Sequence, residues 1–290
     1  MAVLLALAAS AVYGSADFLG GLATRREKPL PVVGLSQLAG LVALVLFLPL
    51  VVGDASAADL EWGVAAGAFG SVGIGLLYSA LSLGKMSVVA PVTAVAGIVV
   101  PVAVGLALGE QPGTASMVGV ALACASIALI SRGSSEAAAP SPEGTLAPPP
   151  GRLGTGPIGR ALGAGLAIGG FYVCLQRTGP GAGLWPLIAA RSFAVCAVGG
   201  ITVASGRRLV ISRDARALSI GAGLCDVLAN VLYLLAVRRG LLSVVATLSS
   251  LYAVSTVILA RFVLGERLRL VQAAGLALAT VAVVLIAGVR

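Results

Sequence analysis

The chain has 290 residues, of which 59% are hydrophobic and only 10% are charged, and its mean hydropathy is +1.07. Soluble domains carry about 25% charged residues, so this composition excludes a soluble globular protein and predicts an integral membrane protein. The formal net charge is +8, but the basic residues lie mostly in short connections between apolar runs, which indicates membrane topology and argues against nucleic-acid binding.

Ten apolar runs of roughly 18 to 24 residues follow one another along the chain, and each is long enough to cross a hydrocarbon core of about 30 Å as a helix. The runs are apolar on every face, whereas the strands of a membrane barrel alternate between apolar and polar residues. We therefore predict an all-α integral membrane protein with ten transmembrane helices, located in the cell membrane. The predicted helices are 2–23, 30–53, 62–84, 86–108, 115–132, 158–178, 181–204, 217–238, 241–263 and 271–288.

Residues 133–157 differ in composition from the rest of the chain, because proline, glycine, serine and alanine dominate and the apolar pattern stops. We interpret this segment as a flexible linker between a first unit, 1–132, and a second unit, 158–290. The linker ends with glycines in G-x-G-x-x-G spacing. A dinucleotide site needs a preceding strand, so no nucleotide cofactor is expected.

The two units, each with five predicted helices, resemble each other in sequence. A shift of 156 residues aligns residues 77–131 with residues 233–287 without a gap, and both segments contain S-V-V-A followed later by G-E. This pattern indicates an internal duplication. Because five is an odd number of crossings, the second copy is expected to be inverted in the membrane, as in transporters whose substrate site lies near the midplane between two repeats.

The repeated motif, A-x3-G-x2-S-x2-A-P followed by G-E and a further glycine, resembles the EamA-type repeat of the drug/metabolite transporter superfamily. In the second copy Thr247 replaces the usual proline, and Tyr13-Gly14 stands where a Trp-Gly pair is common. The resemblance implies a ten-helix secondary transporter. The motif residues are Ala80, Gly84, Ser87, Ala90, Pro91, Gly109, Glu110 and Gly119 in the first copy, and Ala236, Gly240, Ser243, Ala246, Gly265, Glu266 and Gly275 in the second.

Polar residues inside the predicted helices fall at three- and four-residue steps, so each set shares one helix face. All five tyrosines lie within predicted helices, where they fit the lining of a shared polar cavity better than an interfacial belt. The alternative is that these residues only hold neighbouring helices together. The expected substrate- or proton-binding residues are Tyr13, Asp17, Tyr78, Tyr172, Gln176, Asp226, Asn230, Tyr233 and Tyr252.

Asp17 and Asp226 carry the functional interpretation, because an Asp at the centre of a membrane helix costs roughly 2.5 to 3.5 kcal/mol and usually faces a cavity, pairs with a cation or relays protons. Asp17 also resembles, in position only, the acidic first-helix residue of the small multidrug resistance family. Arg191 is the deeply placed cation, and it either reaches the interface, neutralises Asp226 or binds a substrate carboxylate.

Four further residues fit either a gating or a merely structural role. Glu110 and Glu266 lie where the fourth helix of each copy ends, and each is interpreted as a turn residue or as a gating residue. Pro91 and Pro101 remove backbone donors within the fourth helix, so they form either a bend used in gating or a kink that serves packing.

We expect a secondary transporter that exports a small cationic or zwitterionic metabolite or drug-like solute by alternating access, with proton exchange at the membrane-embedded Asp residues. Its partners are then the solute, protons and the bilayer, and a monomer suffices because one chain holds both repeats. A passive facilitator, a membrane-embedded enzyme and a scaffold are the alternatives. An enzyme, a metal site or a cofactor is not expected, because the chain has no histidine and its four cysteines are scattered singly as small core residues.

The distribution of basic residues predicts an orientation. Most of them fall in connections on the side opposite to the two chain ends, and cytoplasmic connections carry the excess of Lys and Arg, so the ends are expected outside the cell. The resemblance to ten-helix relatives implies the reverse orientation, with both ends in the cytoplasm.

Overall fold

The computed structural model describes residues 1–50, 53–135, 156–206, 211–264 and 270–288. Within these ranges the fold is all-helical, and eight helical stretches are long and apolar enough to cross a membrane. The chain is therefore a multi-pass membrane protein. The α-helices are α1 (Ala2–Arg26), α2 (Pro29–Phe47), α3 (Ala57–Leu83), α4 (Met86–Ala107), α5 (Thr114–Ser135), α6 (Pro157–Gln176), α7 (Trp185–Ala204), α8 (Arg213–Val237), α9 (Leu242–Ser250), α10 (Tyr252–Leu264) and α11 (Leu270–Gly288), and the short 3-10 helices are η1 (Leu48–Leu50) and η2 (Pro180–Ala182).

Local sequence signals start several of these helices. Pro29 and Pro157 open α2 and α6, where the missing N–H of proline costs nothing and its fixed φ favours the helix. The N-terminus of α3 has a capping box in which the Ser56 hydroxyl accepts from the Asp59 N–H at 3.2 Å and the Asp59 carboxylate accepts from the Ser56 N–H at 2.9 Å. Between such caps, a helix satisfies its own backbone hydrogen bonds, as a lipid environment requires.

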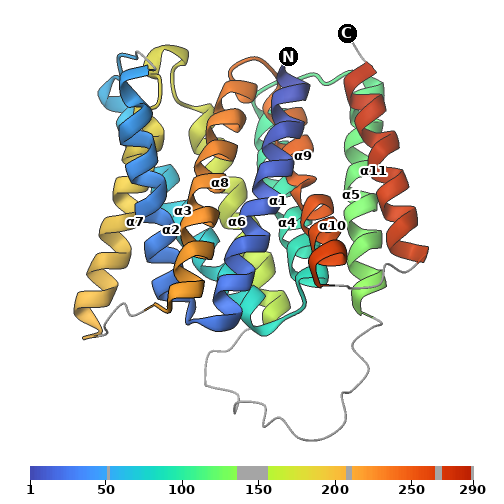
Figure 1. Ribbon diagram of the computed structural model, residues 1–290. Coiled ribbons are helices and arrows are strands. Elements are labelled where there is room, and N and C mark those ends of the chain that lie inside the picture. The colour runs from blue at the N-terminus through green and yellow to red at the C-terminus, as the bar shows by residue number, and fades with distance from the viewer. Residues whose placement is uncertain (51–52, 136–155, 207–210, 265–269, 289–290) are drawn as a thin grey trace, which may run out of the picture.

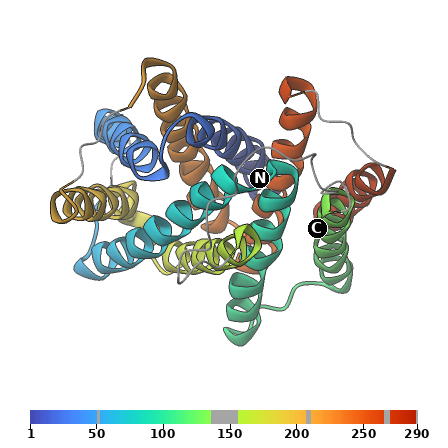
Figure 2. The same ribbon diagram turned by 90° about the horizontal axis from the view of Figure 1, so that it is seen from below.

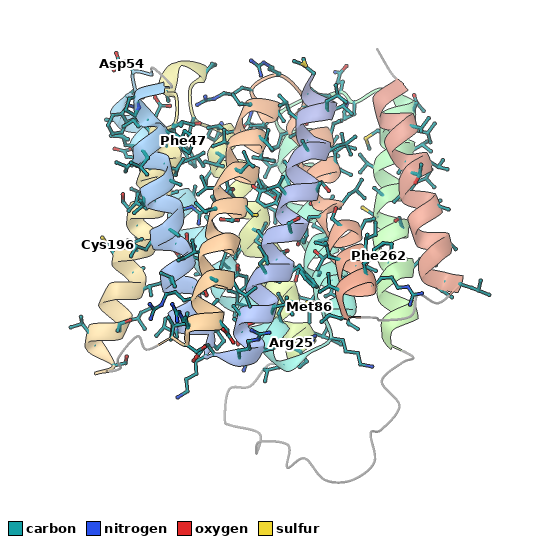
Figure 3. The ribbon with its side chains drawn as sticks, viewed as in Figure 1. Arg25, Phe47, Asp54, Met86, Cys196 and Phe262 are labelled. Atoms are coloured by element: carbon teal, nitrogen blue, oxygen red, sulfur yellow. The ribbon has the colours of Figure 1, made fainter. Side chains whose placement is uncertain are left out.

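Consecutive long helices cross the molecule in alternate directions, so it has two opposite faces (Figure 1). We call the face that carries Met1 and the end of α11 the terminus face. Figure 3 shows Asp54 on the terminus face, and Arg25 and Met86 toward the opposite face. The first helix of the chain, α1, starts on the terminus face, whereas α6 starts on the opposite face.

The helix contacts connect the two halves of the chain throughout. Helix α1 packs on α8, α9 and α10, while α6 packs on α3 and α4, and α2 and α7 lie against α8 and α3. Figure 2 shows α5 and α11 side by side at one edge of the bundle. Small residues permit the closest approaches, because a Cβ added at Gly165 would overlap the Thr93 carbonyl of α4 and one at Gly223 would overlap the Ser36 carbonyl of α2.

The outer surface is strongly apolar. Large side chains such as Phe47 and Phe262, labelled in Figure 3, are mostly exposed, which is the surface that a surrounding bilayer requires. The interior is built largely from alanines, leucines and valines together with all five tyrosines, and it has a smaller share of buried polar side chains. These buried polar side chains define the site described below.

The structure corrects several expectations about helix limits. The ninth run was predicted as one helix over 241–263, but it is divided at Leu251 into α9 and α10. Helix α2 ends at Phe47 and not at residue 53, and α5 continues to Ser135, so the first residues of the predicted linker are helical. Most of the predicted linker lies outside the described residues. Of the cysteines expected in the core, Cys196 is exposed on α7.

Candidate functional site

A cavity with a largely apolar wall and a cluster of polar side chains lies between helices from both halves of the chain. It is formed by α1, α2 and α3 together with α6, α7, α8 and α10, and its volume is about 560 Å³ including its open mouth. Its walls combine alanine, glycine and isoleucine with a group of polar and aromatic side chains. Those side chains are Tyr13, Asp17, Gln37, Ser71, Phe171, Tyr172, Arg191, Asp226, Asn230 and Tyr252.

The strongest electrostatic contact in the cavity wall is an ion pair. The Arg191 Nη2 of α7 binds Asp226 Oδ2 of α8, and the two side chains are only 9% and 14% exposed. The Arg191 Nη1 donates to the buried Gln37 Oε1 of α2. A charge inside a membrane protein is tolerated when it is paired and hydrogen-bonded, so this arrangement accounts for both Arg191 and Asp226.

The network continues from the ion pair to α1. The Asn230 amide donates to Asp226 Oδ2 at 3.2 Å and to the Asp226 carbonyl at 2.8 Å. The Tyr13 hydroxyl in turn donates to Asn230 Oδ1 at 2.6 Å. Four helices are therefore joined by one chain of polar contacts in which every interaction has a charged or amide partner.

Asp226 is paired with Arg191, whereas Asp17 has no compensating partner among the residues that the structure describes. Its side chain lies in the cavity wall one turn of α1 beyond Tyr13 and is only 6% exposed. In the described part of the chain it makes no hydrogen bond or ion pair. The Tyr252 hydroxyl, also in the wall, is buried without a hydrogen-bond partner among the described residues. The cavity thus has a free carboxyl group and a free hydroxyl beside a neutralised ion pair.

Aromatic rings gather on one side of this cavity. The ring of Tyr13 lies 6.1 Å from that of Tyr172 and 6.4 Å from that of Tyr252, measured between centroids. Phe171 lies 5.9 Å from Tyr172, and Tyr233 stacks on the back of Tyr172 at 4.3 Å. Aromatic faces attract cations within about 6 Å, so the wall suits a positively charged or aromatic solute.

Three predicted site residues do not line the cavity. Tyr78 packs against α1, where a Cβ added at Gly20 would overlap its ring. Tyr233 stands behind Tyr172 and donates to the Tyr172 carbonyl at 3.4 Å. Gln176 ends α6, with a buried Oε1 that has no partner among the described residues. The sequence alone could not distinguish residues that pack between helices from residues that line the cavity.

Sequence reasoning missed Gln37 and Ser71, which both line the cavity. Gln37 could have been found, because it is the amide in the middle of an otherwise apolar second helix. Of the residues considered for gating, Pro91 and Pro101 lie inside α4, which continues through both. Glu110 binds the N-terminus of α9, as described further below, whereas Glu266 lies outside the described residues.

The helices and the cavity define a multi-pass membrane protein with an internal cavity that carries charged side chains, and comparison with known proteins identifies its family. The model of the EamA-like transporter family matches residues 1–132 and 158–288, so the chain belongs to that family. Its members are transporters and not enzymes, which fits the expectation from the sequence. A protein crystal structure is similar with a TM-score of 0.68 and 17% sequence identity, covering 97% of this chain and 99% of that chain, which supports the fold. No curated protein sequence matches the chain.

Proposed function

We propose that this membrane transporter is a secondary transporter that exports a small cationic or zwitterionic metabolite or drug-like solute, with Asp17 as the group that binds the cation or a proton. The observation that carries the proposal is the buried Asp17 carboxyl in the cavity wall, which has no partner among the described residues. A carboxyl group that is hard to ionise alone can be stabilised either by a proton or by a cationic solute. Exchange of one for the other would couple solute export to proton entry.

The other charged residues of the site support the proposal that Asp17 is the acid that binds the solute or the proton. Asp226 already has the Arg191 guanidinium, so Asp17 is the acid available to the solute. A zwitterionic solute has a second anchor, because its carboxylate can compete with Asp226 for Arg191. The tyrosine rings beside Asp17 supply a surface for the apolar or cationic part of the solute.

The proposal includes ten membrane crossings arranged as two inverted five-helix repeats, residues 1–132 and 158–290, with α9 and α10 as one broken crossing. The start of α1 on the terminus face and of α6 on the opposite face supports the inversion (Figure 1). The packing also supports it, because α1 meets α8 as α6 meets α3, and α2 meets α8 as α7 meets α3. Such a chain contains both repeats that a transport site needs, so it works as a monomer in the cell membrane.

Transport can be tested with the purified chain in proteoliposomes. A panel of labelled organic amines, quaternary ammonium ions and amino acids is offered with a pH gradient across the membrane. We expect at least one of these solutes to accumulate against its own gradient, and Asp17→Asn to abolish that accumulation. Asp54→Asn is the matched control, because Asp54 is an exposed acid on the terminus face.

The same assay separates the alternatives. Equilibration of a solute without accumulation would identify a passive facilitator and remove proton exchange from the mechanism. Undiminished accumulation by Asp17→Asn would show that Asp17 is not the coupling group. An Asp226→Asn variant, tested in parallel, measures how much the ion pair contributes to solute binding.

A further inference from the structure

The N-terminus of α9 is capped by a residue from the other half of the chain. Its own N-cap residue, Leu241, has no side chain that could accept a hydrogen bond. Instead, Glu110 Oε1 accepts from the Leu242 N–H at 2.6 Å, and Glu110 Oε2 accepts from the Ser243 N–H at 3.0 Å and from the Ser243 hydroxyl at 2.7 Å. A carboxylate at a helix N-terminus satisfies free N–H groups and complements the helix dipole.

Two glycines before Glu110 allow its carboxylate to reach the N-terminus of α9. Helix α4 ends at Ala107, and Gly109 takes a left-handed φ of 85°, which a side chain would disfavour. The Glu110 N–H then bonds the Gly105 carbonyl at 3.0 Å. A Cβ added at Gly105 would overlap Glu110 Oε2, so the glycine leaves the space that the carboxylate occupies beside Ser243.

Helix α9 is short and connects this contact directly to the cavity. It spans only Leu242–Ser250, and the helix is broken at Leu251 before α10 begins with the cavity residue Tyr252. The buried hydroxyls of Ser249 and Ser250 have no hydrogen-bond partner among the described residues. One end of α9 is therefore held by Glu110, while the other end adjoins a break in the helix next to the site.

Other ties between the two halves reinforce the terminus face. Asp59 Oδ1 of α3 accepts from the Gly179 N–H at 2.6 Å, and the Gly181 carbonyl accepts from the Asp54 N–H at 3.0 Å. The ties toward the opposite face include a part-buried bond from Arg160 to the Ser79 hydroxyl, an exposed bond from the Ser212 N–H to Glu27 and an exposed ion pair at 3.8 Å between Arg26 and Asp214. The two halves are therefore tied on both faces, and on the terminus face Glu110 is the tie that acts directly on α9.

We propose that Glu110 is a positioning residue of the transport cycle, acting as a latch that holds α9 against the end of α4 and closes the cavity toward the terminus face. When Glu110 releases Leu242 and Ser243, α9 pivots at Leu251 and carries Tyr252 out of the cavity wall. This inference rests on the proposed function only in requiring that the cavity open to each face in turn.

The latch can be tested without any solute. The four native cysteines are replaced, and Ser249→Cys provides a nearly isosteric reporter inside α9. The protein is placed in nanodiscs, where both faces are accessible, and its labelling by a water-soluble maleimide is timed. Glu110→Gln should raise the labelling rate about five- to tenfold, the change expected for the loss of one helix cap. Glu61→Gln, an exposed acid near the terminus face, is the matched control and should leave the rate unchanged.

A second variant breaks the latch while keeping the charge. Gly105→Ala places a Cβ where Glu110 Oε2 lies, so it should accelerate labelling as Glu110→Gln does. Gly75→Ala is its control, because a Cβ there meets no atom within 4 Å. If Glu110→Gln does not fold, judged by size-exclusion chromatography, Gly105→Ala and Ser243→Ala decide the question.

Unchanged labelling in the folded variants would overturn the latch, whatever the transport assay shows. Conversely, latch-dependent labelling in a protein that moves no solute would contradict the proposed function and leave the latch standing. The labelling assay therefore tests the role of Glu110, and the transport assay tests the proposed function, independently of each other.

Discussion

Arg191 of α7 and Asp226 of α8 form a buried ion pair in the wall of the central cavity. Gln37 and Asn230 complete the hydrogen bonding of the pair. A buried ion pair gains little over an apolar pair of the same size, but the loss of one partner leaves an uncompensated charge. The contribution of each of these two residues to stability therefore depends on the presence of the other.

This dependence predicts a non-additive effect on stability. Arg191→Met and Asp226→Asn should each destabilise the protein, by about 3 to 5 kcal/mol where the remaining charge stays buried. The double variant should recover much of the loss, because it leaves no unpaired charge. Thermal unfolding in detergent, followed for both single variants and the double variant, measures the effect.

The exposed ion pair between Arg26 and Asp214 offers the control. Its atoms are 3.8 Å apart and its side chains are 54% and 81% exposed, so Arg26→Met and Asp214→Asn should change stability by less than about 1 kcal/mol. Simple additivity at Arg191 and Asp226 would show that the two side chains are not energetically coupled.

The hydrogen bond from Tyr13 to Asn230 should stabilise the link between α1 and α8. Tyr13→Phe removes the donor at 2.6 Å and leaves Asn230 Oδ1 without it, which should cost about 1 to 3 kcal/mol. Tyr78→Phe is the control, because the Tyr78 hydroxyl makes no hydrogen bond in the described part of the chain. Equal unfolding temperatures for Tyr13→Phe and Tyr78→Phe would contradict the assignment.

The contact between α1 and α10 depends on the small size of Gly14. A Cβ added there would lie 2.5 Å from Ser255 Cβ and 2.7 Å from the Tyr252 carbonyl, which is too close for either. Gly14→Ala should force the helices apart and destabilise the protein by about 1 to 3 kcal/mol. Because Tyr13 and Asp17 flank Gly14, transport should fall as well, whereas Gly75→Ala should behave like the natural protein.

Much of the fold could be predicted from the sequence, because lipid leaves the backbone few alternatives. A long apolar run must satisfy its own backbone hydrogen bonds, so hydropathy located the helices well. It failed at Leu251, where the sequence L-S-S-L-Y-A has no proline or glycine to indicate a break. Nothing local marks this break, and Gly14, which is distant in the sequence, packs against Tyr252 just beyond it.

The candidate site was predictable where a residue type is costly in lipid. Asp17, Arg191 and Asp226 were found because a charge inside an apolar run needs a reason, and all three line the cavity. Tyr233 was placed in the site by helical spacing and Tyr78 because every tyrosine lies within a predicted helix, and neither signal separates packing from lining a cavity. The contact of Glu110 with Ser243 joins residues 133 positions apart, and a pairing so distant is visible only in the folded chain.

The charges on the two faces predict how the protein lies in its membrane. The described basic residues at the helix ends gather on the face opposite to the terminus face, and cytoplasmic loops carry the excess of Lys and Arg. We therefore expect the terminus face to lie outside the cell, the reverse of the orientation that the family resemblance implies. The basic residues are Arg25, Arg26, Lys28, Lys85, Arg160, Arg213, Arg216 and Arg261 on the opposite face, and Arg177, Arg238 and Arg239 on the terminus face.

Two exposed arginines, one on each face, allow a direct test. In a chain without the four native cysteines, Arg239→Cys should react with a membrane-impermeant thiol reagent on intact cells. Arg216→Cys should react only after the cells are permeabilised, because its face lies in the cytoplasm. Both arginines are exposed, so a difference in labelling reports the side of the membrane and not burial. Ready labelling of Arg216→Cys on intact cells, with protection of Arg239→Cys, would overturn the charge-based orientation and place both chain ends in the cytoplasm.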